Sequence, residues 1–361
     1  MKTMIETVTL KNFKAIKSAK LKLTSPTIFI GNNGSGKSSV IEALQTLQNV
    51  MLDNVSNAFT NRWYGLEKVR NQHANSDPIE IQISGKLDDK KFDYHIAFNT
   101  TTNYDLYFVA SEHFTLRLGK EKEKVFSILS ETEQTVTLKT HHRIEAQNLL
   151  EYIRSWQFTN IIPELMYDPV TRKQTNQIVK LDSTGKNLAD VFSRLQDDLT
   201  TFNVILDRMR YVLPDLADIT AKHDDLRKEV FLQLQENHHQ TALPNWLFST
   251  GTLRILALLM LLNSPNPPPV LFIEEIENGL DPRTLNLLVE EIRNSIQTTQ
   301  VIVTSHSPYF LDLMDLSHII VAEREKGNTT YFRPDNDKNL IEWKKEFSAG
   351  QLYSMGKLTK S

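Results

Sequence analysis

The residues from Gly31 to Ser39 are small and polar, and their spacing is distinctive. They read Gly-Asn-Asn-Gly-Ser-Gly-Lys-Ser-Ser and follow the apolar run Ile28-Phe-Ile30. The pattern G-x-x-x-x-G-K-S lets successive backbone N–H groups surround phosphate oxygens, with glycines where a Cβ would clash or where φ must be positive. We therefore expect a phosphate-binding loop between a strand and a helix.

Two side chains in this loop have chemistry suited to a nucleotide. Lys37 can place its ammonium group near the β- and γ-phosphates, and the Ser38 hydroxyl can serve as an oxygen ligand of Mg²⁺. The helix that begins there points the positive end of its dipole at the same phosphates. The residues predicted to bind the nucleotide are Asn32, Asn33, Gly34, Ser35, Gly36, Lys37, Ser38 and Ser39.

A second group of polar residues follows apolar strands in the last third of the chain. The run Val270-Leu-Phe-Ile273 ends in Glu274 and Glu275. One carboxylate can hold Mg²⁺ through its water shell, and the other can orient an attacking water. The turn Asn278-Gly-Leu-Asp-Pro282 follows, and His306 comes one strand later. Because chemistry in a parallel sheet sits at strand ends, we expect these residues to act together with the loop.

Just before the acidic strand, Phe248-Ser-Thr-Gly-Thr-Leu-Arg254 opens a helix. Ser249 is a candidate N-cap, and Gly251 leaves the backbone exposed. A capped helix alone carries no function, so its position before the acidic strand is what makes it a candidate site.

The elements that position these groups follow from hydrophobic periodicity. Two strands, Ile5 to Leu10 and Ala19 to Leu23, precede the loop, and a helix from Ser39 to Leu52 follows it. From Ile79 to Leu138 the period is two, which predicts an antiparallel meander, with Val136 to Leu138 as its last strand. Strands at 270–273 and 300–304 flank a helix at 283–296, which predicts a parallel sheet.

The middle of the chain is predicted to be a compact helical arm. Its longest element is one amphipathic helix carrying apolar residues from Leu188 to Leu206, and Val230 to Leu234 is a candidate strand. His238 and His239 lack ligand partners at helical spacing, so we assign them to the surface rather than to a metal. The domains expected are 1–148, 149–240 and 241–361.

Composition limits the cellular setting and the partners. The formal net charge is −3 at pH 7, so nucleic-acid binding would need a local basic patch. There is no cysteine, which excludes disulfides and thiolate metal sites. The run Ile255 to Leu262 is too short to cross a bilayer, and the first residues lack a signal-peptide core. We expect a soluble, cytoplasmic α/β protein.

The order of these motifs resembles the ABC-type ATPases. Within that class the chain is similar to the RecF- and SMC-like branch, specifically the AAA_21 ATPases of bacterial defence and toxin–antitoxin loci that lack a TOPRIM domain. The resemblance also rests on Leu10-Lys-Asn-Phe-Lys-Ala-Ile16, Gly185-Lys-Asn-Leu-Ala189 and the segment Phe347 to Gly356. It implies an ABC-ATPase head, in which a parallel sheet with the phosphate loop and an antiparallel β subdomain carry a helical insertion.

The resemblance also implies roles for residues. Lys37 and Ser38 would bind the phosphates of ATP and Mg²⁺, with Glu274 beside the metal, and Glu275 would polarise water. His306 would sense the γ-phosphate. In a homodimer that encloses two ATP molecules, Ser249 and Gly251 would contact ATP across the interface, and Asp281 would lie in the cross-dimer loop. The expected function is a nucleotide-driven switch that controls a separate effector protein in anti-phage defence.

Two features depart from the family pattern. The family usually has Asp-Glu where this chain has Glu274 and Glu275, and the extra methylene moves the first carboxylate by about 1.5 Å. We therefore expect slow hydrolysis. The glutamine that assists Mg²⁺ is not fixed by the sequence: Gln157 is one candidate, and Gln174 and Gln177 compete with it.

Three other functions stay open. A nuclease resembling the OLD-like relatives would use Glu323, Asp335 and Asp337, although 335–338 also fits a turn. A regulator that binds ATP without turnover would differ from the expected switch only in its rate of ATP hydrolysis. A DNA-repair or DNA-tethering ATPase would need a patch drawn from Lys11, Lys14, Lys17, Lys20, Lys22, Arg143, Arg172 and Lys173.

Overall fold

The computed structural model describes residues 3–359 except 102, 104, 105, 120, 131, 132, 173–178, 344 and 345. The chain forms two compact units. Unit 1 comprises Met1–Trp156, Ile302–Pro308 and Asp315–Ser361, and unit 2 comprises Gln157–Val301 and Tyr309–Met314. The division into 1–148, 149–240 and 241–361 stays a prediction.

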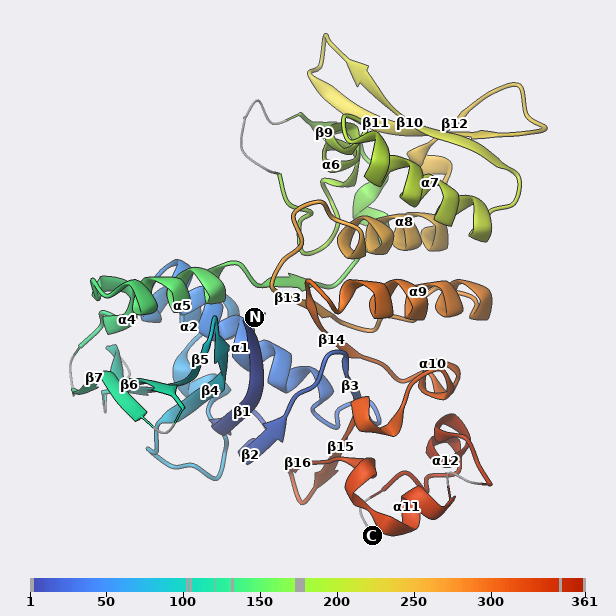
Figure 1. The fold of residues 1–361 in the computed structure, drawn as a ribbon. Helices are drawn as coiled ribbons and strands as arrows, with labels where there is room; N and C mark the ends of the chain where they lie inside the picture. Colours follow the sequence, from blue (N-terminus) through green and yellow to red (C-terminus); the bar gives the residue numbers. More distant parts are fainter. Residues whose placement is uncertain are drawn as a thin grey trace. The chain divides into compact units, whose positions relative to one another are not determined.

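An antiparallel sheet of six strands forms one part of unit 1, in the order β2-β1-β4-β5-β6-β7 (Figure 1). The alternation predicted from Ile79 onward is confirmed, because Ile79, Ile81 and Ile83 are fully buried while their neighbours are partly exposed. The strands are β1 (Met4–Phe13), β2 (Ile16–Lys22), β4 (Ile79–Leu87), β5 (Lys90–Thr100), β6 (Tyr107–Leu118) and β7 (Glu121–Leu129).

The predicted strand at Val136 to Leu138 is wrong, since helix α4 occupies Thr137–Thr140. The buried carboxylate of Glu112 in β6 accepts hydrogen bonds from the backbone N–H groups of Thr137 and Leu138, at 2.6 and 2.9 Å. It thereby satisfies donors that a helix start leaves open. The other helices of this part are α1 (Lys37–Leu52), α2 (Val55–Trp63), α3 (Leu66–Val69) and α5 (Ile144–Arg154).

A second sheet in unit 1 carries the loop. Its strand β3 (Thr27–Ile30) pairs in parallel with β14 (Gln300–Thr304) through residues 302–304, and with β15 (Ile319–Glu325). The strand β16 (Asn328–Phe332) returns antiparallel to β15 and ends the sheet. The remaining elements near the C-terminus are η3 (Leu316–His318), η4 (Pro334–Asn336), α11 (Lys338–Trp343) and α12 (Ala349–Ser354), and α10 is Pro308–Asp312.

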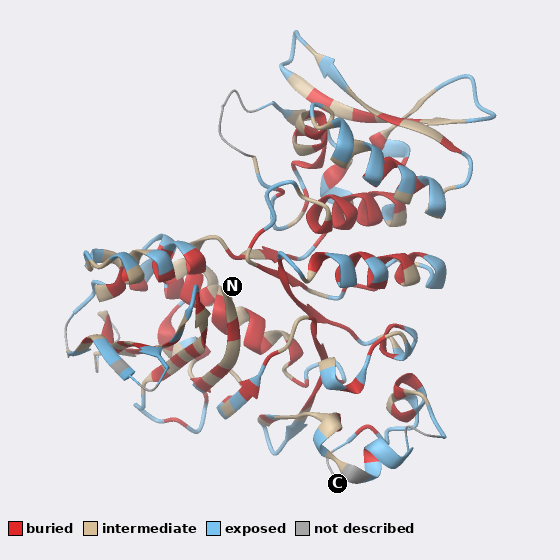
Figure 2. Ribbon diagram, in the orientation of Figure 1, coloured by how far each residue is buried: buried red, intermediate tan, exposed pale blue. Residues whose placement is uncertain are grey.

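Unit 2 is built around α8 (Thr250–Leu262), which is buried along almost its whole length (Figure 2). The helices α7 (Leu199–Val212) and α9 (Pro282–Ser295) pack against it, as does the short helix η1 (Pro163–Met166). Two parallel strands, β8 (Gln157–Thr159) and β13 (Val270–Ile273), complete this part, with the rings of Phe158 and Phe272 stacked 4.2 Å apart. The predicted α/β alternation is confirmed here.

The single long helix predicted from Leu188 is wrong, because the chain forms α6 (Leu188–Leu195) and then α7. The carboxylate of Asp198 accepts the N–H of Thr201 and starts the second helix. The same segment also contains an antiparallel sheet, so the predicted arm holds strands as well as helices. These are β9 (Val170–Thr171), β10 (Leu216–Asp224), β11 (Glu229–Glu236) and β12 (Leu243–Pro244), followed by η2 (Asn245–Leu247).

Within the described part of the chain, no helix combines the length and the apolar character needed to cross a membrane.

Candidate nucleotide-binding site

The predicted phosphate loop connects β3 to α1, as the sequence indicated. Gly31, Gly34 and Gly36 all have positive φ, at 147°, 77° and 98°. Side chains at Gly31 and Gly36 would also meet neighbours, since a Cβ on Gly31 would lie 2.2 Å from the Ala322 carbonyl oxygen. The glycines therefore let the backbone curl where other residues would be strained.

Lys37 lies across the loop that it belongs to. Its Nζ donates hydrogen bonds to the carbonyl oxygens of Gly31 at 2.7 Å and Asn32 at 3.1 Å, and the side chain is buried. The Ser35 hydroxyl is buried without a hydrogen-bond partner among the described residues. A buried hydroxyl without a partner and a lysine ammonium held at the loop both fit an anionic phosphate. Ser38, whose hydroxyl could hold Mg²⁺, follows in the first turn of α1 and is partly exposed.

His306 belongs to the same unit as the loop. It follows β14, whose residue Thr304 pairs with Phe29 of β3, and Ser305 N donates to the Phe29 carbonyl oxygen at 2.9 Å. The strands are parallel, so their carboxyl ends lie at the same edge of the sheet. The structure therefore places the exposed His306 at the edge from which the phosphate loop starts.

The signature candidates lie at the start of α8 in unit 2. Ser249 is the N-cap, as predicted, and its hydroxyl accepts the N–H of Thr252 at 3.0 Å. A Cβ on Gly251 would lie 3.0 Å from the Gly279 carbonyl oxygen, so this helix start is close to the turn that follows the acidic strand. A glycine at position 251 permits that approach.

Glu274 and Glu275 follow β13 as expected, and the second has an unusual backbone. Glu275 has φ of 48°, a left-handed conformation that costs energy for a residue with a Cβ. Its carbonyl oxygen accepts a hydrogen bond from Arg254 Nη2 at 2.6 Å, and its carboxylate accepts one from the Asn278 side chain. Arg254 is buried and also donates to the Ile161 carbonyl oxygen at 2.8 Å.

The charge of Arg254 sits among three carboxylates. Burial lowers the pKa of its guanidinium, while Glu277, Glu275 and Glu164 act in the opposite direction. The sequence placed Arg254 only in an apolar helix, and its role as a backbone support was missed. A single arginine within the run Leu253 to Leu262 was the signal that could have revealed it.

Asp281 is the N-cap of α9. Its carboxylate accepts hydrogen bonds from Thr284 N at 3.0 Å and from Thr284 Oγ1 at 2.7 Å. Partial burial acts to raise the pKa of Asp281, but the hydrogen bonds from Thr284 outweigh it and lower the pKa below its ordinary value. This helix-capping role needs only one chain. The cross-dimer role that the resemblance implied stays a prediction.

Of the glutamine candidates, Gln157 does not stand at a strand end near the acidic pair. It opens β8, and its amide donates to the Leu181 carbonyl oxygen at 3.0 Å. The residue after β8 is Asn160, next to Thr159, whose carbonyl oxygen accepts the N–H of Glu274. Asn160 thus lies at the carboxyl end of β8, and Gln174 and Gln177 lie outside the described residues, so the position of the glutamine stays a prediction.

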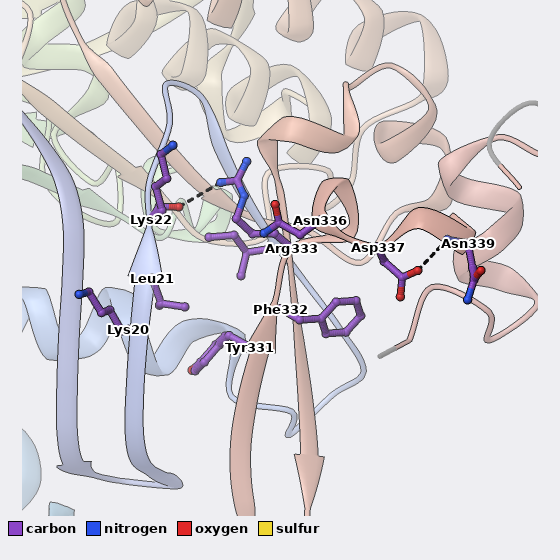
Figure 3. A pocket seen from close by; sticks show the side chains of 10 residues that line it. Lys20, Leu21, Lys22, Tyr331, Phe332, Arg333, Asn336, Asp337 and Asn339 are labelled. Atoms are coloured by element: carbon purple, nitrogen blue, oxygen red, sulfur yellow. Dashed lines mark hydrogen bonds between the residues drawn. The ribbon is translucent and has the colours of Figure 1, made fainter. Parts of the chain in front are cut away.

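Two of the acidic residues considered for a nuclease make local contacts. Asp335 pairs with Arg333 at 3.0 Å. Asp337 accepts the N–H of Asn339 at 2.9 Å (Figure 3). Asp337 and Arg333 line a groove of about 820 Å³ beside β2 and β16. Among the described residues, no cluster of three His, Asp or Glu side chains could hold a metal ion.

Each unit therefore carries part of the predicted set. Unit 1 holds the loop residues Asn32, Asn33, Gly34, Ser35, Gly36, Lys37, Ser38 and Ser39 together with His306. Unit 2 holds Ser249, Gly251, Glu274, Glu275 and Asp281, which gather around Arg254 and the turn 275–281.

Solved structures of similar fold are heads of SMC proteins. The SmcHead bound to the C-winged helix domain of ScpA aligns with a TM-score of 0.57 and 14% identity, covering 94% of this chain and 99% of that chain. An Smc head with an extended coiled coil, bound to the C-terminal domain of ScpA derived from Pyrococcus furiosus, gives 0.57 and 12% identity over the same shares. These likenesses show the ABC-ATPase head fold.

Similarity in sequence extends over most of the chain. The "Retron Vc95 probable ATPase" of Vibrio cholerae serotype O1 biovar El Tor is 22% identical over 383 residues, which cover 86% of this chain and 71% of that protein. The family described as "AAA domain, putative AbiEii toxin, Type IV TA system" matches residues 27–312. With most of its length matched, and with a phosphate loop on an SMC-head fold, this chain belongs to the AAA_21 family of RecF- and SMC-like ATPases.

Proposed function

We propose that this protein binds ATP with Mg²⁺, hydrolyses it slowly, and uses the nucleotide to switch its assembly and control a partner effector. The observation that carries the proposal is the phosphate loop, with three glycines at positive φ and Lys37 bonded across it. Membership of the AAA_21 family supports ATP as the ligand.

The residues present suit these roles. Lys37 would hold the phosphates, Ser38 and Glu274 would hold Mg²⁺, and Glu275 would orient the attacking water. Mg²⁺, when bound, would neutralise charge on the phosphates and on the leaving group. The side chain of His306 would donate a hydrogen bond to the γ-phosphate.

The switch rests on a second copy of the chain. Ser249 and Gly251 lie at an exposed helix start, where backbone N–H groups could complete the binding of ATP held by the partner. Because ATP would then contact both copies, it would favour the closed pair, and hydrolysis would release it. The retron ATPase and the ScpA-bound heads support the idea of a separate partner protein, and defence against phage is the biological setting that we propose.

The basic side chains give little support to the DNA-binding alternative, because three of them are paired with carboxylates. Lys11 pairs with Glu80 at 3.0 Å, Lys14 with Glu42 at 2.6 Å, and Arg143 with Glu123 at 2.6 Å. These pairs cancel charge that phosphates would need. The exposed Lys17, Lys20 and Lys22 remain on β2, and Lys173 lies outside the described residues.

The test is solution mass by light scattering, with ATP and Mg²⁺, with a non-hydrolysable analogue, and without nucleotide. Wild type should form a larger species with nucleotide, and Glu275→Gln should hold that species longer by blocking hydrolysis. Lys37→Ala should not respond. Lys222→Ala removes the same charge from an exposed strand position and should behave as wild type.

A mass that is the same for wild type and Lys37→Ala in every condition would refute the assembly switch. Binding of ATP by wild type but not by Lys37→Ala, measured by calorimetry in parallel, would still support the nucleotide site itself.

A further inference from the structure

The hairpin formed by β15 and β16 contacts the phosphate loop through two side-chain hydrogen bonds. Thr329 Oγ1 donates a hydrogen bond to the Ser35 carbonyl oxygen at 2.9 Å, and the Tyr331 hydroxyl donates to the Gly36 carbonyl oxygen at 2.8 Å. Both donors come from β16, almost 300 positions after the loop in the sequence. Two consecutive carbonyl groups of the loop are therefore fixed by two side chains of one strand.

Fixing these carbonyls also fixes the N–H groups on the other side of each peptide. In a trans peptide the C=O and N–H bonds point in opposite directions. The Ser35 carbonyl shares its peptide plane with the N–H of Gly36, and the Gly36 carbonyl shares its plane with the N–H of Lys37. Bonds that hold both carbonyls against β16 therefore turn both N–H groups away from β16, as a phosphate-binding loop requires.

The hairpin is itself well supported. Thr329 is buried, and its backbone N–H donates to the Ala15 carbonyl oxygen at 2.7 Å, in the turn between β1 and β2. The ring of Tyr331 meets the ring of Phe29 edge to face, with centroids 6.2 Å apart, on the strand that leads into the loop. Burial, and then the carboxylate of Glu42, raise the pKa of Tyr331, so its hydroxyl keeps the proton that it donates.

The contact also explains why position 36 must be glycine. A Cβ there would lie 2.4 Å from Thr329 Oγ1 at a φ of 98°, so a side chain would be strained and would displace the Thr329 hydroxyl from the loop. Tyr331 and its neighbour Phe332 leave β16 in opposite directions (Figure 3), so the strand presents one hydroxyl to the loop and another ring away from it.

We propose that Thr329 and Tyr331 are positioning residues that orient the N–H groups of Gly36 and Lys37 for the phosphates of the nucleotide. This inference rests on the proposed ATP site. It assigns a function to β16 that neither the loop motif nor the family match supplies.

The experiment compares ATP affinity, by calorimetry on the full chain, among Thr329→Val, Tyr331→Phe and wild type. Each variant removes one hydroxyl with little change in volume. Losing one such hydrogen bond should raise the Kd for ATP about five- to tenfold. Thr329→Ser keeps the hydroxyl, so its Kd for ATP should lie within about twofold of that of wild type. Thr330→Val is the matched control, since Thr330 is the exposed neighbour on the same strand.

Two results would overturn the inference: Thr329→Val binding ATP no more weakly than Thr330→Val, or Thr329→Ser binding as weakly as Thr329→Val. Tyr331→Phe gives an independent answer if Thr329→Val fails to fold, which urea unfolding without nucleotide would reveal. A different result would refute the proposed ATP site itself: wild type and Lys37→Ala would bind ATP equally poorly. Unchanged affinity in the hydroxyl variants with loss in Lys37→Ala refutes the positioning role alone.

Discussion

Arg254 Nη2 lies 2.6 Å from the carbonyl oxygen of Glu275, and this bond joins α8 to the second residue after β13. Glu275 is held at φ of 48°, where a residue with a side chain is strained. The buried guanidinium compensates that strain by satisfying the carbonyl, and it also satisfies that of Ile161. The position of the Glu275 carboxylate therefore depends on a residue of α8.

Replacing Arg254 should impair both stability and hydrolysis. Arg254→Met leaves the buried Ile161 carbonyl oxygen without its donor and leaves the Glu275 carbonyl oxygen with the N–H of Asn278 alone, so the free energy of unfolding should fall by about 1–3 kcal/mol. Arg254→Lys keeps the charge but cannot reach both carbonyls, so it should fold and still hydrolyse ATP more slowly. Urea unfolding and phosphate release measure the two effects. Arg227→Met, at a side chain 75% exposed, is the control and should change neither.

Asp281 allows its helix-capping role to be separated from its proposed role across a dimer. Asp281→Ser replaces the carboxylate with a hydroxyl that can still accept the N–H of Thr284, so stability should stay close to that of wild type. Asp281→Ala removes the cap and should destabilise the protein by about 1 kcal/mol. If the carboxylate also acts across the dimer, Asp281→Ser should still reduce ATP-dependent assembly. If wild type and Asp281→Ser assemble to the same extent with ATP, then Asp281 acts only as a helix cap.

The sequence was most informative where the interacting residues are neighbours. The phosphate loop, its strand and its helix are contiguous, and Ser249 caps a helix that begins one residue later, so local rules identified them. The break between α6 and α7 was missed because apolar residues keep a helical period across Asp198, whose capping bond only the structure shows.

Long-range partners could not be predicted in the same way. The helix at Thr137 depends on Glu112, which lies in a strand 25 positions earlier. Thr329 and Tyr331 contact the loop only because β15 pairs with β3, and one sequence gives no register for that pairing. The role of Arg254 was missed because its carbonyl acceptors at Ile161, Glu274 and Glu275 are distant in sequence.

Glu112 should make stability depend on pH in a direction opposite to that of an exposed, paired carboxylate. Burial raises its pKa above the ordinary 4.5, although hydrogen bonds from Leu138, Tyr94 and Thr137 partly offset this. A raised pKa means that its contribution is fully present below 4.5 and is lost as pH rises through the pKa in the folded state. Glu112→Gln cannot ionise. The difference between its free energy of unfolding and that of wild type should therefore change as the pH rises from 4.5 through the pKa of Glu112 in the folded state.

The measurement is urea unfolding of wild type and Glu112→Gln at several pH values from about 4 to 7. Other carboxyl groups titrate in both proteins and cancel in the difference. A difference that does not vary with pH would show that Glu112 is not the group responsible.

Glu274 is the position where this chain departs from the Asp-Glu order of its family. Its backbone is fixed by the bond from Glu274 N to the Thr159 carbonyl oxygen at 3.0 Å, so a longer side chain must place its carboxylate elsewhere. Glu274→Asp withdraws that carboxylate by about 1.5 Å and should bring it to the distance at which the proposed Mg²⁺ site would hold it through water. We expect phosphate release to rise several-fold with ATP affinity unchanged. Glu275→Asp, the matched control one residue on, should lower the rate because the water-orienting group would then be too short. A slower Glu274→Asp protein would mean that this site is built around the longer side chain, and slow turnover would then need another cause.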